Sequence, residues 1–307
     1  MSTATSNRRF YFGDGALALA TGMAVLAILA MLFVLLLEIV RGGAGSISWA
    51  FLSTPPSKGG LRGGIWPAIY GTALLVLVMT IAATPVGVAT AIYLHEYARP
   101  TAWLTRMVRA AIANLAGVPS IVFGLFGVGF FIETVGSKID EVFYDGGLLY
   151  GKPALLWAAL TLALLTLPVV IVATEEALRT IPMEHREGSL ALGATRWQTI
   201  TRVVLPQALP GILTGAILAV SRGAGEVAPI LFTGVAYYMA SLPGNLSDQF
   251  MDLGYHVFVL STQSPDIEKT RPILYATVLV LLMLTFALNF VAVIIRARVR
   301  KKLRALG

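Results

Sequence analysis

Six apolar stretches, each about as long as a membrane-spanning helix, constrain this chain more than any other feature of its sequence. A hydrocarbon core about 30 Å thick requires roughly 20 mostly apolar residues per helix. The stretches that meet this requirement are 16–39, 67–94, 108–135, 153–174, 209–233 and 272–295. Charged residues make up only 13% of the chain, compared with about 25% in soluble domains. The sequence therefore predicts an all-α polytopic membrane protein with six transmembrane helices.

The first apolar stretch, 16–39, stands where a secretory signal peptide would stand but differs from one. It is longer than the apolar region of a signal peptide, and no small-residue cleavage site follows it. We therefore expect an uncleaved first span. The expected organisation is an N-terminal tail (1–15), one transmembrane domain (16–295) and a basic C-terminal tail (296–307).

Lysine and arginine are distributed unequally between the two sides of the six expected spans. With the N-terminus in the cytoplasm, the inner segments hold 15 of these residues and the outer segments hold 7. Positive charge gathers on the cytoplasmic side of membrane proteins. The distribution predicts that both termini are cytoplasmic. Membrane orientation also accounts for the net charge of +7. Because the positive charge needs no nucleic acid to explain it, we expect no nucleic-acid partner.

The outer connections show no catalytic or metal-binding pattern. The longest of them, about 234–271, contains an apolar run too short to span, which we expect to form a short helix at the membrane interface. His256 lies in this run without a second ligand type at metal-binding spacing. The chain has no cysteine and shows no nucleophile–base arrangement. We expect neither an enzyme nor a metal site.

An arginine and a glutamate lie inside the fifth apolar stretch, in the sequence SRGAGEVAP. Arg222 follows Leu209 by 13 residues, about 20 Å along a helix, which places it near or just beyond the bilayer midplane. A charge there costs at least about 2.5–3.5 kcal/mol and persists only against protein or a wet path. Glu226 comes four residues later, so we expect the two side chains to meet on one helix face.

Two interpretations of this pair stay open. In the first, Arg222 and Glu226 form an intramembrane ion pair that fixes helix packing. In the second, Arg222 contacts an oxyanion in transit, since its guanidinium stays protonated and forms bidentate hydrogen bonds, and Glu226 is its counter-ion. Ser120, beside Pro119, is a weaker candidate for the same path, because such a serine more often bonds a carbonyl of its own helix.

The segment 175–206, between the fourth and fifth stretches, is too long to be a simple turn. We expect it to begin as helix, to break at Pro182 and to form a second helix over 184–191. Gly193 stands where a helix would end with a left-handed residue. A third, amphipathic run over 197–204 completes a compact knob.

The knob has small residues on its second helix and ends at a leucine–proline pair. Such a shape suits insertion into a groove on another protein; the alternative is a loop that packs only on its own membrane domain. The sequence reads Glu187-Gly188-Ser189, three residues, Gly193, nine residues, then Val203, one residue, Leu205 and Pro206. This spacing resembles the EAA motif of the permeases of ABC importers.

The resemblance implies a type I ABC importer permease (MetI-like) fold, in which the knob is a coupling helix that docks on a cytoplasmic ATPase. It assigns the coupling contact to Glu187, Gly188, Ser189, Gly193, Leu205 and Pro206. The chain has no P-loop sequence. A separate ATPase chain must therefore use the ATP, and we expect this chain to bind no cofactor of its own.

Four longer stretches resemble the phosphate-specific importer permeases, the PstA family. They cover residues 53–72, 116–127, 175–200 and 221–234, so the resemblance runs from about residue 50 to the end. In the fifth span the family mostly has alanine and threonine where this chain has Gly223 and Val227. Arg222 and Glu226 match the family pattern.

This resemblance implies that the cargo is phosphate. It also implies a multi-pass protein in the lipid bilayer of a bacterial inner (cytoplasmic) membrane. The implied partners are a PstC-like permease in a heterodimer, a PstB-like ATPase dimer and a PstS-like phosphate-binding protein. Three rivals stay open: a permease for sulfate, molybdate or another oxyanion, a secondary transporter or channel, and a sensory subunit. Secondary transporters often contain internal repeats. We find no convincing repeat between the two halves of this chain, which disfavours that rival.

Overall fold

The computed structural model of the protein describes residues 12–57, 62–239, 241–264 and 266–304. Most of the expected N-terminal tail, with Arg8 and Arg9, lies outside these residues. Within them, six helical segments are long and apolar enough to cross a membrane. The prediction of an all-α chain with six spans is confirmed.

The spanning segments consist of single helices or of helices joined end to end. They are α1 (Phe12–Gly43), α3 (Trp66–Ile92) with the π-helical turn η3 (Tyr93–Tyr97), α5 (Ser120–Phe126) with η4 (Gly127–Gly136) and α6 (Ser137–Phe143), α7 (Leu155–Arg179), α9 (Arg196–Thr199) with η5 (Ile200–Val204) and α10 (Leu205–Gly223), and α12 (Ile267–Arg304). Between them lie η1 (Ala44–Ser46), α2 (Trp49–Ser53), α4 (Trp103–Leu115), α8 (Met183–Ala191), α11 (Leu253–Thr262) and an antiparallel pair of short strands, β1 (Pro56–Ser57) and β2 (Arg62–Gly63).

The predicted bounds of the third span, 108–135, are wrong. Trp103–Leu115 forms the separate amphipathic helix α4, and the span is Ser120–Phe143. Gly117 and Pro119 lie between the two helices. The residue before a proline is driven out of the helical conformation, so the chain breaks at this point and restarts as α5.

The predicted bounds of the fifth span, 209–233, are also wrong. One continuous helical segment runs from Arg196 to Gly223, so the amphipathic run does not end at the Leu205-Pro206 pair. Pro206 has no amide hydrogen to donate to the helix, and the π-helical turn Ile200–Val204 directly before α10 lets the helix continue past it. Beyond Gly223 the chain is no longer helical.

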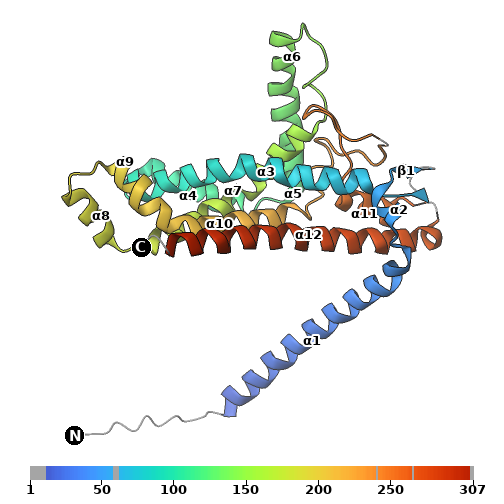
Figure 1. Ribbon diagram of the computed structural model, residues 1–307, viewed down its shortest axis with the longest axis horizontal. Helices are drawn as coiled ribbons and strands as arrows, with labels where there is room; N and C mark the ends of the chain where they lie inside the picture. Colours follow the sequence, from blue (N-terminus) through green and yellow to red (C-terminus); the bar gives the residue numbers. More distant parts are fainter. Residues whose placement is uncertain (1–11, 58–61, 240, 265, 305–307) are drawn as a thin grey trace.

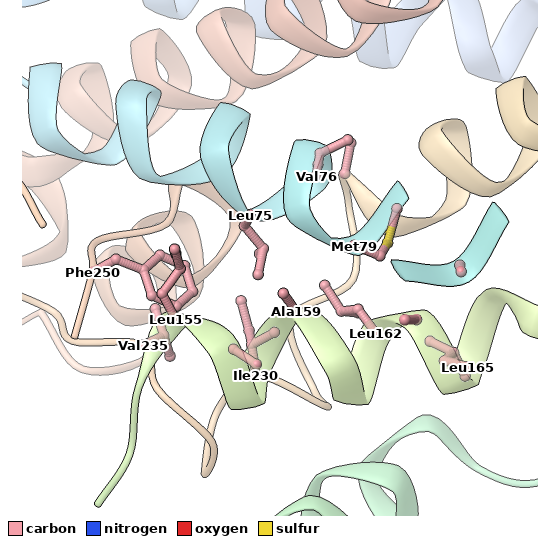
Figure 2. Close-up of a cluster of buried hydrophobic side chains, with 14 of the residues drawn as sticks. Leu75, Val76, Met79, Leu155, Ala159, Leu162, Leu165, Ile230, Val235 and Phe250 are labelled. Atoms are coloured by element: carbon pink, nitrogen blue, oxygen red, sulfur yellow. The ribbon is translucent and has the colours of Figure 1, made fainter. Parts of the chain in front are cut away.

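The helix α7 is the centre of the bundle and the most buried of the six spans. Figure 1 shows α3 and α10 lying along it, with α12 on the outer side of α10. A cluster of buried apolar side chains joins α3 to α7, including Leu75 and Met79 from α3 and Leu162 from α7 (Figure 2). Gly87 brings α3 close to α7, since a Cβ there would lie 2.7 Å from Val170 Cγ1.

The helix α1 diverges from the bundle (Figure 1). The C-terminal end of α1 touches α12, where Gly42 and Gly43 of α1 lie against Tyr275 of α12. Residues 15–36 of the helix are apolar on all sides and exposed. A helix of this kind is stable in lipid or against other membrane helices.

Candidate functional site

The arginine and the glutamate of the fifth span meet, but not on one helix face as predicted. Arg222 lies in the last turn of α10, and Glu226 lies beyond the end of that helix. The Nε atom of Arg222 is 3.6 Å from Oε1 of Glu226. The two side chains are 38% and 26% exposed. The pair is therefore formed at the end of a helix, and both of its side chains are partly exposed.

The two positions that depart from the family pattern are packing positions. A Cβ on Gly223 would lie 2.7 Å from Cε of Met79 on α3, so glycine makes room for that buried methionine. Val227 lies against α11, where a Cβ on Gly254 would be 2.8 Å from Val227 Cγ2. These contacts hold the chain on either side of Arg222 and Glu226 against α3 and α11.

Ser120 is the first residue of α5 and is half-buried. Gly124, one turn later on the same helix face, packs against the chain just after Glu226, because a Cβ there would lie 3.0 Å from the Pro229 carbonyl oxygen. The structure therefore brings the face of α5 that carries Ser120 against the segment that follows the ion pair.

A second arginine–glutamate pair lies on the same side of α10. Arg109 of α4 donates from Nη1 to Oε2 of Glu175 at 2.9 Å and from Nη2 to the Leu94 carbonyl at 3.0 Å. This pair lines a mostly apolar cavity of about 410 Å³ that also reaches Leu218, one turn before Arg222. Sequence reasoning missed it, because 66 residues separate its members and no local pattern links them.

The knob forms as predicted in its first part. The helix α7 ends at Arg179, Pro182 precedes α8, and Gly193 follows α8 with a φ of +84°. Residues with a side chain rarely adopt that left-handed conformation. The chain can therefore reverse after α8 and enter α9, where Thr195 caps the helix through a hydrogen bond from the Gln198 amide.

The motif residues divide into three groups in space. Glu187 and Gly188 are exposed on α8, and a Cβ on Gly188 would meet open space. Ser189 faces inward, with its Oγ 2.9 Å from Oγ1 of Thr199. Leu205 and Pro206 lie farther along, at the start of α10. The outward surface of the knob is therefore made by α8 and the turn after it.

That outward surface is apolar in part. Leu192 is 90% exposed, Met183 62% and Trp197 63%. The knob lies at one end of the bundle, with the α8 helix turned away from the spans (Figure 1). Large apolar and aromatic side chains are enriched at protein–protein interfaces, so this end of the molecule suits docking on another protein.

Arg186 fastens the knob to the bundle, and sequence reasoning missed this role. Arg186 belongs to α8, and its buried side chain donates from Nη1 to the Ile181 carbonyl at 2.8 Å and from Nη2 to the Leu178 carbonyl at 3.0 Å. Nη2 also lies 2.9 Å from Oε1 of Glu96, in the π-helical turn η3 that continues α3. One guanidinium therefore satisfies carbonyls at the end of α7 and joins α8 to α3.

The predicted short outer helix is α11, at the opposite end of the bundle from α8 (Figure 1). His256 is buried there and stacks on Tyr237, with ring centroids 5.4 Å apart. Burial lowers the pKa of His256 to about 4. In the part of the chain that the structure describes, no group of three or more His, Cys, Asp or Glu side chains could hold a metal ion.

Comparison with known proteins agrees with this architecture. Residues 83–304 match the family described as binding-protein-dependent transport system inner membrane component. The chain is 32% identical over 284 residues to the phosphate transport system permease protein PstA of Yersinia pestis. The aligned part covers 92% of this chain and 89% of that protein. It is 37% identical to the probable ABC transporter permease protein YqgI of Bacillus subtilis, over 70% and 69% of the two chains.

A further relative is PstA 1 of Mycobacterium tuberculosis, 43% identical over 55% of this chain but only 50% of that protein. Among solved structures, a bacterial alginate ABC transporter chain has a TM-score of 0.66 at 15% identity, covering 91% of this chain and 93% of its own. A chain of the MetNI methionine ABC transporter has a TM-score of 0.57 at 21% identity, and the match covers 76% of this chain and 94% of that chain.

These two structures show the fold, that of a type I ABC importer permease. The six apolar helices and the permease relatives make the protein a multi-pass inner membrane protein. By the match over residues 83–304, the chain belongs to the family of binding-protein-dependent transport system inner membrane components.

Proposed function

We propose that this chain is the membrane-spanning permease subunit of an ATP-driven importer of inorganic phosphate. It forms half of the translocation path, and a PstC-like permease forms the other half. Both termini and the α8 knob lie in the cytoplasm, in agreement with the excess of lysine and arginine on that side.

The observation that carries the proposal is the knob itself. It combines the EAA spacing with exposed apolar side chains at one end of the bundle, which suits a groove on a cytoplasmic ATPase. A PstB-like ATPase dimer binds and hydrolyses the ATP, so this chain acts as a coupling subunit rather than as an enzyme and binds no cofactor of its own. A PstS-like protein delivers phosphate at the opposite end.

The choice of phosphate rests on the names of the relatives and on the chemistry of Arg222. An anion in a low-dielectric passage is costly unless a cation meets it, and a guanidinium binds phosphate oxygens in a bidentate manner. At 3.6 Å from Glu226 and partly exposed, Arg222 can exchange one anionic partner for another. Competition from Glu226 keeps phosphate binding transient, as conduction requires. Ser120 contributes a hydroxyl to the same path.

The test is ATP-driven uptake of labelled phosphate by proteoliposomes that contain the reconstituted complex, with excess unlabelled sulfate, molybdate or arsenate as competitor. We expect inhibition by arsenate, which has the shape and charge of phosphate, and none by sulfate or molybdate. Equal inhibition by sulfate or molybdate would assign the permease to another oxyanion. Absence of ATP-dependent uptake would contradict the proposal as a whole.

A further inference from the structure

We propose that the continuous helical segment of α3 and η3 carries the movement of the α8 knob to the outer helix α11, and that Glu96 in η3 and Thr72 in α3 are the positioning residues at its two ends. This inference rests on the proposed function, since the knob moves only if an ATPase docks on it. It goes beyond that function by naming the element through which the docked ATPase acts on the far side of the membrane.

The inner connection is the largely buried pair of Glu96 and Arg186. Their side chains are 12% and 10% exposed, and Glu96 Oε1 accepts from both Nε and Nη2 of Arg186 at 3.3 and 2.9 Å. Separating buried charges that are paired leaves each one uncompensated. A displacement of α8 therefore moves the end of α3 with it, because the alternative is to break this pair.

The outer connection is also polar and buried. The Thr72 hydroxyl donates to Oδ2 of Asp252 at 2.8 Å and accepts from the Leu253 amide at 2.9 Å. The other carboxylate oxygen of Asp252 caps α11 by accepting from the Tyr255 amide at 2.9 Å. Thr72 is fully buried and Asp252 nearly so. One hydroxyl thus joins α3 to the first turn of α11.

Backbone packing reinforces the outer connection. Gly71, next to Thr72, lies directly against the Met251 carbonyl, so that a Cβ at this position would clash with that oxygen. The chain entering α11 cannot slide along α3 without losing both this contact and the hydrogen bonds of Thr72. The start of α11 is therefore held to α3 by shape as well as by polar contacts.

The two connections lie at opposite ends of one helical segment. Thr72 and Glu96 are 24 residues apart, about 36 Å along a helix, which exceeds the roughly 30 Å hydrocarbon thickness of a bilayer. Figure 1 shows α3 running from the α11 end of the bundle to the α8 end. Pro85 interrupts its hydrogen bonds, yet close packing on α7 continues past it at Gly87.

The experiment follows α11 in the full reconstituted complex. The chain has no cysteine, so Ser261→Cys, at an exposed position on α11, supplies its one labelling site for an environment-sensitive fluorophore. The fluorescence is recorded before and after ATP with vanadate, and phosphate uptake per ATP hydrolysed is measured in parallel. We expect the labelled parent complex to respond to the nucleotide.

The matched variants act at the two ends of α3. Thr72→Val removes the hydroxyl at nearly constant shape, and Thr72→Ser keeps it. Glu96→Gln removes the charge at the inner end, and Glu133→Gln removes an exposed charge on η4 as a control. We expect Thr72→Val and Glu96→Gln to lose the fluorescence response and at least tenfold in uptake per ATP while ATP hydrolysis continues. Thr72→Ser and Glu133→Gln should behave like the parent.

The outcomes separate this inference from the proposed function. A parent complex without ATP-driven phosphate uptake contradicts the proposed function. A parent that imports phosphate without a fluorescence response, or a Glu96→Gln complex with the full response and full uptake per ATP, overturns the role of α3. If the Thr72→Val complex does not assemble, Glu96→Gln at the other end gives the same readout.

Discussion

Arg222 and Glu226 form an ion pair across the end of a helix, with Nε and Oε1 3.6 Å apart. Arg222 belongs to the last turn of α10, whereas Glu226 lies in the non-helical chain that turns back toward α5 and α11. A movement of that chain changes the distance between the two charges. The pair can therefore open when the segment around it moves, which a pair fixed on one helix face could not do.

Glu226→Gln removes the counter-ion that competes with phosphate for Arg222. We expect phosphate to be held longer, so that both the KM for phosphate uptake and the maximal rate fall, each by about threefold to tenfold. Uptake kinetics in proteoliposomes measure both quantities. An unchanged KM together with poor assembly of the complex would instead indicate that the pair serves packing alone.

Gly193→Ala places a side chain at a φ of +84°, where L-residues are strained by roughly 1–2 kcal/mol. We expect the turn after α8 to distort and binding of the ATPase subunit to weaken by about tenfold, measured by co-purification at graded ATPase concentrations. Gly22→Ala on α1, away from the knob, is the control, since a Cβ there meets open space within a helix. Equal binding by the two variants would show that the turn geometry does not matter for docking.

The sequence predicted the features that depend on local patterns. The six spans follow from apolar length, and the knob follows from Pro182 and Gly193, whose backbone preferences act within a few residues. The end of α10 at Gly223 was missed, because apolar residues continue past it and the contact of Gly223 with Met79 on α3 is not visible in the local sequence.

The ion pairs at the α8 end of the bundle were missed for a related reason. Arg186 and Glu96 lie 90 residues apart, and Arg109 and Glu175 lie 66 apart. In the sequence these arginines count only toward the positive charge that orients the chain. Their pairing depends on how α3, α4, α7 and α8 pack, which a single sequence without a structure does not specify.

Gly71→Ala puts a methyl group against the Met251 carbonyl oxygen. Because a backbone atom cannot move aside as a flexible side chain can, we expect a loss of about 1–3 kcal/mol in stability, seen as a lower unfolding temperature of the detergent-solubilised complex. Gly129→Ala on η4 is the control, since nothing lies within 4 Å of its Cβ position. Equal unfolding temperatures would show that α3 and α11 are not in close backbone contact.

His256 makes the stability of α11 depend on pH. Its pKa is lowered from 6.5 to about 4 by burial, so below pH 6.5 the opened state takes up a proton that the folded state excludes. The stability of α11 should fall as the pH drops from 6.5 toward 4, by on the order of 2 kcal/mol at pH 5.

Hydrogen exchange of the α11 amides, corrected for intrinsic rates, measures this dependence. His256→Phe keeps a ring that can stack on Tyr237 but has no proton to gain, so the loss of α11 protection that His256 causes between pH 6.5 and 5 should disappear. Burial also raises the pKa of Asp252, the N-cap of α11, and this group acts in both proteins. Equal pH dependence of α11 protection in the wild-type protein and in His256→Phe would contradict the buried, neutral state of His256.

The most direct test of the account is phosphate uptake by complexes that carry Arg222→Gln or Arg222→Lys. Glutamine removes the charge, and lysine keeps it without the bidentate geometry of a guanidinium. We predict normal assembly in both, uptake reduced at least a hundredfold by glutamine, and an intermediate loss with lysine. An assembled Arg222→Gln complex that imports phosphate at the wild-type rate would contradict the claim that phosphate passes through contact with Arg222.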